Sequence, residues 1–198
     1  MANATADYGF VPYDSISGEI RTFEAAVLVA AGDLFVGDAV EFSGTGDSQG
    51  RASIDAAAAA AARICGVIVG FKASGPDGLA TQYIASANAG TAIVVPTLST
   101  TIFRVNGHGA TGVALNDIGL SADHVAGSGD VLTGKSGFTL DLGEGATAPT
   151  ANDLSWLIWG FDRRADNEFS TTVSTNTIDV DILVRCKESY WSTMSQGA

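Results

Sequence analysis

Short apolar runs separated by clusters of glycine, asparagine, aspartate and serine recur along this chain of 198 residues. Runs of this length, bounded by turn-forming residues, are typical of β-strands joined by turns. Nine such runs occupy residues 24–30, 38–43, 64–72, 81–85, 91–95, 100–106, 138–142, 154–162 and 178–187. The pattern predicts an all-β fold, a mainly antiparallel β-barrel or sandwich. In the last run Val180, Ile182 and Val184 would face one side of a sheet, and Asp181 and Arg185 the other.

Two segments favour short helical turns. The first is the run of seven alanines at 56–62, with Ser53 or Asp55 as its cap. Alanine has the highest helix propensity, and serine and aspartate are preferred N-caps. The second, residues 114–119, has the length of a single turn. Segments 44–53 and 143–153 are rich in glycine and polar residues, which predicts exposed loops.

The first 20 residues contain scattered polar residues and carry the isolated aromatic residues Tyr8, Phe10 and Tyr13. We predict that residues 1–20 form an extended N-terminal arm and that residues 21–198 form one β-rich domain. A partly disordered terminus is the alternative. Removing such an arm is expected to leave the core folded. The segment has neither the basic nor the apolar region of a secretory signal, so we expect none.

The chain is acidic: 22 Asp and Glu residues against 10 Lys and Arg residues give a formal net charge of −12. Nucleic acids and anionic membrane surfaces are bound through clustered cations. We therefore expect no nucleic-acid partner and no membrane partner. No apolar run reaches the 18 or more residues that a membrane-spanning helix needs.

Residues that could carry catalysis are few. Cys65 and Cys186 lie in apolar runs and are expected to be buried, reduced thiols. His108 and His124 lack a histidine partner at metal-ligand spacing, and we expect ordinary surface or turn residues. We find no phosphate-binding loop and no nucleophile motif. The sequence thus predicts no enzyme, no catalytic residue and no cofactor.

One pair of carboxylates can be considered as a metal site. Asp179 and Asp181 would share one face of a strand, about 7 Å apart. A Ca²⁺ site is one interpretation of this pair, and a solvated strand face is the other. We favour the solvated face and expect no metal site.

The densest polar cluster spans residues 162–168, DRRADNE, directly after the apolar run that ends at Phe161. Opposite charges at this density favour a network of charge-assisted hydrogen bonds. A solvated loop with weak ion pairs is the alternative, and composition alone favours it. Three tryptophans are large anchors for a core or an interface. We expect Trp156 and Trp159 in the core and leave Trp191 as a candidate for a subunit contact.

Several of these segments resemble, in order and spacing, a family of tailed-bacteriophage capsid decoration proteins, also called cement proteins. Residues 66–71 (G-V-I-V-G-F) are similar to the family's G-V-V-V-G-F strand. Residues 102–105 (I-F-R-V) resemble its I-F-E-I-Q strand, with Arg104 at a place where an acidic residue is common. The other similar segments are 116–122 (N-D-I-G-L-S-A), 127–129 (G-S-G), 133–141 (T-G-K-S-G-F-T-L-D), 157–168 (L-I-W-G-F-D-R-R-A-D-N-E) and 182–185 (I-L-V-R). An extra residue here replaces the proline of the family's D-R-P-D-N-E turn.

The resemblance implies a structural protein that binds the outer surface of the phage head and stabilises the lattice of the major capsid protein. It implies a virion location after synthesis in the host cytoplasm, and a homotrimer at three-fold contact points. The candidate contact residues are Tyr8, Phe10 and Tyr13 on the arm, Arg163, Arg164, Asp166, Asn167 and Glu168 in the turn, and Trp191. Another virion module, such as a head fibre or tail protein that binds host glycans, is the alternative. Replacing Arg163 is expected to weaken assembly more than replacing Arg51, chosen as an exposed control.

Overall fold

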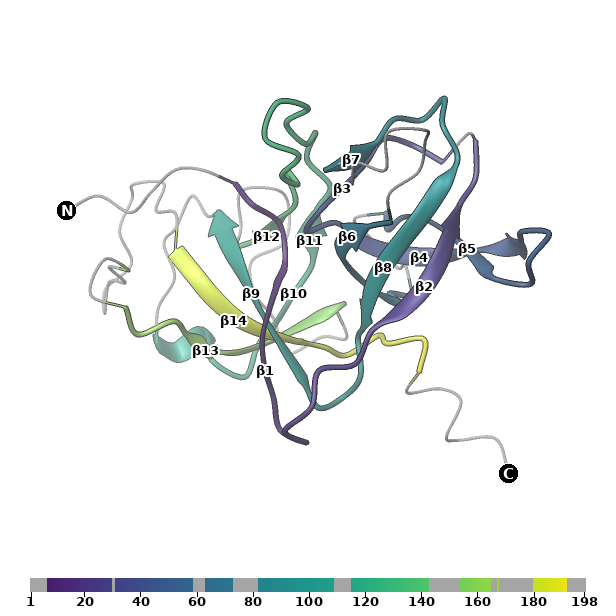
Figure 1. Cartoon of the computed structure of the whole chain (residues 1–198). Helices are drawn as coiled ribbons and strands as arrows, with labels where there is room; N and C mark the ends of the chain where they lie inside the picture. The colour runs from purple at the N-terminus through teal and green to yellow at the C-terminus, as the bar shows by residue number, and fades with distance from the viewer. Residues whose placement is uncertain are drawn as a thin grey trace.

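The computed structural model describes residues 7–29, 31–58, 63–72, 82–108, 115–142, 154–164, 167 and 180–191. These residues form fourteen strands and one short 3-10 helix (Figure 1), so the all-β prediction is confirmed. The strands are β1 (Val11–Ser15), β2 (Phe23–Val27), β3 (Leu34–Phe35), β4 (Ala39–Gly46), β5 (Ala52–Ala56), β6 (Gly66–Phe71), β7 (Tyr83–Ile84), β8 (Gly90–Pro96), β9 (Thr101–His108), β10 (Ser121–Ala122), β11 (His124–Val125), β12 (Thr139–Asp141), β13 (Trp156–Phe161) and β14 (Val180–Cys186), and the helix is η1 (Leu115–Asp117).

Two main sheets lie side by side (Figure 1). The first, here called the open sheet, has seven strands in the order β10-β13-β14-β9-β12-β11, with β1 also paired to β9. The second is a closed barrel, β2-β5-β4-β6-β8, and β3 pairs with β7 separately. Among these strands only β2 with β5 and β12 with β9 pair in parallel. A mainly antiparallel barrel is therefore what the chain forms.

All nine predicted strands are present, with ends that differ by a few residues. The two-residue strands β3, β10 and β11 were too short to give a sequence pattern. β4 and β5 extend into segment 44–53, so the predicted loop there is only the turn between them. Segment 143–153 lies outside the described residues.

The predicted helix on the alanine run does not begin as expected. Ser53 and Asp55, its predicted caps, are strand residues of β5. Ala57 is buried and donates its N–H to the Ala39 carbonyl at 2.9 Å, which continues the pairing of β5 with β4. Residues 59–62 lie outside the described residues. The second predicted turn is confirmed as η1, and no described helix is long and apolar enough to cross a membrane.

Buried side chains form two clusters. In β14, Val180, Ile182 and Val184 alternate into the larger cluster, as the period of two predicts. That cluster also contains Val67 of β6 and Val95 of β8, so the open sheet and the barrel share one core. The second cluster fills the barrel interior.

The N-terminal segment is part of this core in its described portion. β1 pairs antiparallel with β9, and Phe10 is 1% exposed. The Phe10 ring stacks on Trp156 with centroids 4.3 Å apart, and its N–H donates to the Gly37 carbonyl at 2.8 Å. Gly37 has a φ of +102°, and a Cβ there would lie 2.5 Å from the Tyr8 carbonyl oxygen. The chain therefore needs glycine where the N-terminal segment crosses the barrel.

Asp38, just before β4, is a buried carboxyl, 2% exposed. Its Oδ2 accepts the Phe35 N–H at 2.8 Å, while Oδ1 has no partner among the described residues. Burial raises the pKa of Asp38 from 3.8 to about 6. The folded state therefore binds this proton more tightly than the unfolded chain does, and ionising Asp38 destabilises the fold.

We expect Asp38→Asn to stabilise the protein at pH 8 relative to wild type. A rise of about two pKa units corresponds to about 3 kcal/mol in the free energy of unfolding. The wild-type contribution is fully present below pH 3.8 and is lost as the pH rises through about 6. Urea denaturation of both proteins at several pH values measures this. A difference that stays constant between pH 4 and pH 8 would contradict the assignment.

Candidate binding site

The candidate site lies on the outer face of the open sheet, opposite the shared core. β14 pairs with β9 so that Leu183 faces Arg104, and with β13 so that Arg185 faces Leu157. These four side chains are partly exposed, whereas their strand neighbours Phe103, Val184 and Ile158 are buried. Half of the 10 cationic residues of this acidic chain lie on or next to these three strands: Arg104, Arg163, Arg164, Arg185 and Lys187.

Trp159 lies on this outer face and is 44% exposed, so the expectation that it is a core residue is wrong. The pairing of β13 with β14 shifts between Ile158 and Gly160, which makes Trp159 the extra residue of a β-bulge. The Arg185 guanidinium lies over the indole ring, 4.8 Å from its centroid. By contrast Trp156 is fully buried, as predicted.

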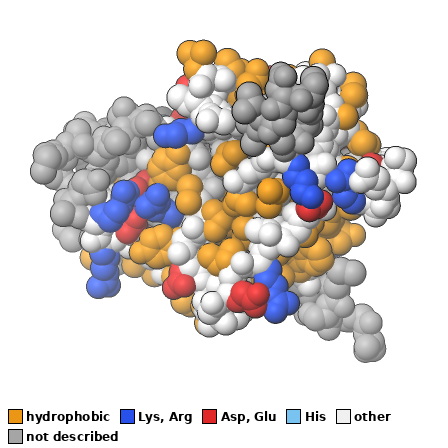
Figure 2. Space-filling view, in the orientation of Figure 1, with side chains coloured by type: hydrophobic (Ala, Val, Ile, Leu, Met, Phe, Trp, Pro, Cys, Tyr) orange, Lys and Arg blue, Asp and Glu red, His pale blue; other side chains and the backbone are white. Residues whose placement is uncertain are grey.

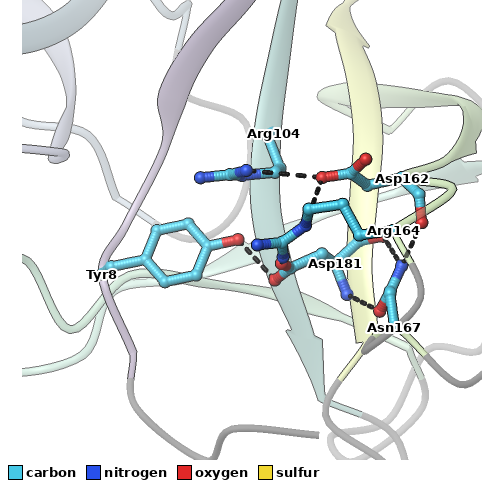
Figure 3. Close-up of polar contacts among 6 residues, drawn as sticks. All are labelled: Tyr8, Arg104, Asp162, Arg164, Asn167 and Asp181. Atoms are coloured by element: carbon cyan, nitrogen blue, oxygen red, sulfur yellow. Dashed lines mark hydrogen bonds and ion pairs between the residues drawn. The ribbon is translucent and has the colours of Figure 1, made fainter.

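The end of β13 is fixed by a buried polar network (Figure 3). Asp162 and Asp181 are 3% and 8% exposed. The Arg164 Nε donates to Asp162 Oδ2 at 2.9 Å, and its Nη2 donates to Asp181 Oδ2. Composition alone favours a solvated loop for this cluster, and the sequence predicts a solvated strand face for Asp181. Both interpretations are wrong for the described residues, because each carboxylate is buried and paired. Asp179 lies outside the described residues.

Asn167 ties this network to the backbone of two strands. Its Nδ2 donates to the carbonyl oxygens of Asp162 at 2.6 Å and Asp181 at 2.9 Å. Its Oδ1 accepts the Asp181 N–H at 2.9 Å. Asn167 is only 7% exposed, so it is a buried clamp and not a direct contact residue.

Tyr8 and Arg104 extend the network toward the N-terminal segment. The Tyr8 hydroxyl donates to Asp181 Oδ1, and the Arg104 guanidinium lies over the Tyr8 ring, 5.5 Å from its centroid. Arg104 Nη1 also donates to Asp162 Oδ2 at 3.3 Å. Burial raises the pKa of Tyr8, and the nearby Arg104 charge opposes this rise. Tyr8 therefore stays protonated at neutral pH and donates a hydrogen bond to Asp181.

Beside this network the surface is hollowed into a groove of about 630 Å³ between η1 and the outer face of β13 and β14. Its apolar lining includes Leu115, Ile118 and Trp159, each 44–45% exposed. Arg163 and Arg164 line the polar end of the groove. In Figure 2 several cationic side chains lie on the left of the visible face, and others lie on its right.

The other predicted contact residues divide into three groups. Phe10 is buried, which removes it from the contact set, while Tyr13 is 49% exposed on β1. Trp191 is partly buried against Phe23, Phe42 and Tyr190 and donates its indole N–H to the Cys65 carbonyl at 2.7 Å. Asp166 and Glu168 lie outside the described residues.

Cysteines and histidines are accounted for by local packing. Cys65 and Cys186 are free and buried, as predicted, and burial raises the pKa of each thiol to about 12. His124 is 1% exposed, which contradicts the expected surface or turn position. Its Nδ1 faces the Trp156 indole N–H at 3.3 Å, and its Nε2 faces the Ala57 carbonyl at 3.2 Å. These partners require the neutral tautomer with the proton on Nε2, and burial lowers the pKa accordingly.

His108 is partly exposed and contacts Asp7 Oδ1 through Nε2 at 2.9 Å. Within the described ranges, no three His, Cys, Asp or Glu side chains are grouped to hold a metal ion.

Two signals in the sequence point to this outer face. Trp156 and Trp159 are three residues apart, and residues three apart in a strand point to opposite faces. Arg104 is the single charged residue in an apolar run, which places its face outward. No pattern along the chain could show that Tyr8, Arg104 and Asp181 meet, because that contact depends on the pairing of distant strands.

Comparisons were made with protein-family models, with curated proteins and with solved structures. None of the three gave a match.

Proposed function

We propose that this protein is a capsid decoration protein, which binds the outer surface of a phage head and stabilises the lattice of the major capsid protein. The observation that carries the proposal is the anchoring of segment 162–167 by Asn167. This segment belongs to one of the stretches that resemble the decoration family, and its polar residues Asp162, Arg164 and Asn167 all enter the buried network. A rigid support of this kind is what a preorganised binding surface needs.

The charge of the chain also supports this function. A net charge of −12 keeps a protein soluble at the high concentration that coating a shell requires. A protein that binds the assembled shell better than free subunits shifts the equilibrium toward the shell. At a concentration of 100 Kd each site contributes about 2.7 kcal/mol. We propose a homotrimer as the bound form, because closed symmetry suits a three-fold position in a lattice.

The exposed Trp159 is the one observation that favours the second candidate, a virion module that binds host glycans. Sugars stack on free aromatic faces, and one face of Trp159 is covered by Arg185. The aliphatic residues around the groove are also more typical of protein–protein contacts. Capsid binding is therefore the preferred function.

We expect the purified protein to co-sediment with heads of the virus that encodes it, after those heads have been stripped of it. Rebinding should raise the temperature at which the heads release DNA. Arg163→Ala should lower this gain more than a control replacement. The structure rules out Arg51 as that control, because Arg51 is bound to Asp47 and Thr91. Arg21 pairs only with the exposed Glu19 in the described structure and is the better choice. Equal losses for Arg163→Ala and Arg21→Ala would contradict the role of the turn, and absent co-sedimentation would overturn the function.

A further inference from the structure

We propose that the groove beside β13 binds an extended peptide segment in which a single carboxylate lies between bulky aliphatic residues. This inference rests on the proposed function, because the segment would belong to the capsid protein that the chain decorates.

The apolar part of the groove specifies aliphatic side chains. Leu115 begins η1, Ile118 directly follows η1, and Trp159 comes from the β13 bulge. All three expose nearly half of their surface. Bulky apolar side chains that converge on one groove mark a protein contact more than a solvated surface. Burying them against leucine or isoleucine side chains would remove this apolar area from water.

The charged end of the groove specifies one carboxylate. Arg104 and Arg164 are already paired with Asp162 and Asp181, so their charges are offset within the network. Arg163 is exposed and has no ion pair within the described part of the chain. Its guanidinium is thus the group at the rim that is open to a carboxylate, which it can bind through a fork of two hydrogen bonds.

The floor of the groove has room for a peptide backbone. Gly160 lines the groove, and a Cβ built on it meets nothing within 4 Å. Its φ lies outside the left-handed region, so another residue fits there without strain. Gly160→Val therefore fills the groove while it leaves the charge unchanged. Gly70 is the matched control: it also follows a register shift in a strand, its Cβ also meets open space, and it belongs to the barrel strand β6.

The test uses the full chain and an immobilised array of seven-residue peptides with two aliphatic residues on each side of a central aspartate. A second array has asparagine at the centre. We expect wild-type protein to bind the best aspartate peptides about tenfold more tightly than their asparagine counterparts, since 1.4 kcal/mol is a factor of ten. Arg163→Gln should abolish that difference. Gly160→Val should weaken both arrays at least tenfold, whereas Gly70→Val and Arg21→Gln should bind like wild type.

Other outcomes overturn the inference. Equal binding of both arrays, unchanged binding by Gly160→Val, or no binding to any peptide would each do so. Binding of a neutral oligosaccharide that Gly160→Val abolishes would assign the groove to glycans instead. Rebinding to viral heads separates this inference from the proposed function. If wild type and Gly160→Val coat heads equally well, the function stands and the groove is not the contact; if peptides bind but heads do not, the function falls and the groove's specificity stands.

Discussion

Deleting residues 1–20 is expected to destabilise the whole protein severely, because this segment contributes to the shared core. The deletion removes Phe10, which is buried against Trp156 and His124. The Phe10 and His124 rings are nearly perpendicular, with centroids 6.3 Å apart. Emptying a buried phenylalanine site costs about 3–5 kcal/mol. The deletion also removes the β1–β9 pairing and the Tyr8 hydroxyl from Asp181. Domains of this kind have only about 5–15 kcal/mol of stability in total.

Urea denaturation followed by tryptophan fluorescence measures this effect. Two point variants separate the buried residue from the rest of the segment. Phe10→Ala should by itself lower the free energy of unfolding by about 3–5 kcal/mol. Tyr13→Thr, three residues further along in β1 but at an exposed position, should change it by less than about 0.5 kcal/mol. If the truncated chain unfolds at the same urea concentration as the full chain, the segment is a separable arm, as the sequence predicts.

The difference between these two expectations has a physical cause. Residues 1–20 contain no alternating apolar run, so the local pattern gives neither a strand nor a core position. Phe10 is buried because β1 adds to the side of β9 and closes the core over Trp156. That pairing joins residues about ninety positions apart, and no local propensity reports it. The glycine requirement at Gly37 was likewise invisible without the crossing segment.

Strands whose sequence alternates between apolar and polar residues were predicted well, because this pattern is local and does not depend on a distant partner. In β14 the alternation of Val180, Ile182 and Val184 fixes which face is buried, whatever strand lies beside it. The alanine run shows the reverse case, since alanine propensity favours a helix and pairing with β4 holds its first residue in strand β5. His124 shows why the burial of a polar residue is hard to predict from the sequence. Its burial depends on partners from Trp156 and Ala57 that satisfy both ring nitrogens, and neither partner is near it in sequence.

Asn167→Ala is expected to lower the free energy of unfolding by about 2–4 kcal/mol, although it removes only one small polar side chain. Three hydrogen bonds are lost, those of Asn167 to the Asp162 carbonyl, the Asp181 carbonyl and the Asp181 N–H. Of these groups the Asp181 carbonyl still accepts the Asp162 N–H at 3.1 Å. A buried group left without a hydrogen bond costs about 1–3 kcal/mol, and water entering the site recovers part of that cost. Asn167→Asp should be at least as harmful, because it replaces the donor with an oxygen that faces two carbonyls and adds a charge beside Asp162 and Asp181.

Arg163→Gln is the comparison variant, because it should weaken binding without changing stability. Arg163 is exposed, so its replacement should change stability by less than about 0.5 kcal/mol while it weakens binding to heads. Asn167→Ala should reduce both stability and binding, because the network it supports positions the Arg163 backbone. Urea titrations and head co-sedimentation on the two variants measure both quantities. An Asn167→Ala protein that keeps wild-type stability would show that the clamp is not needed. One that loses stability yet binds heads normally would show that the turn is held in place by something other than Asn167.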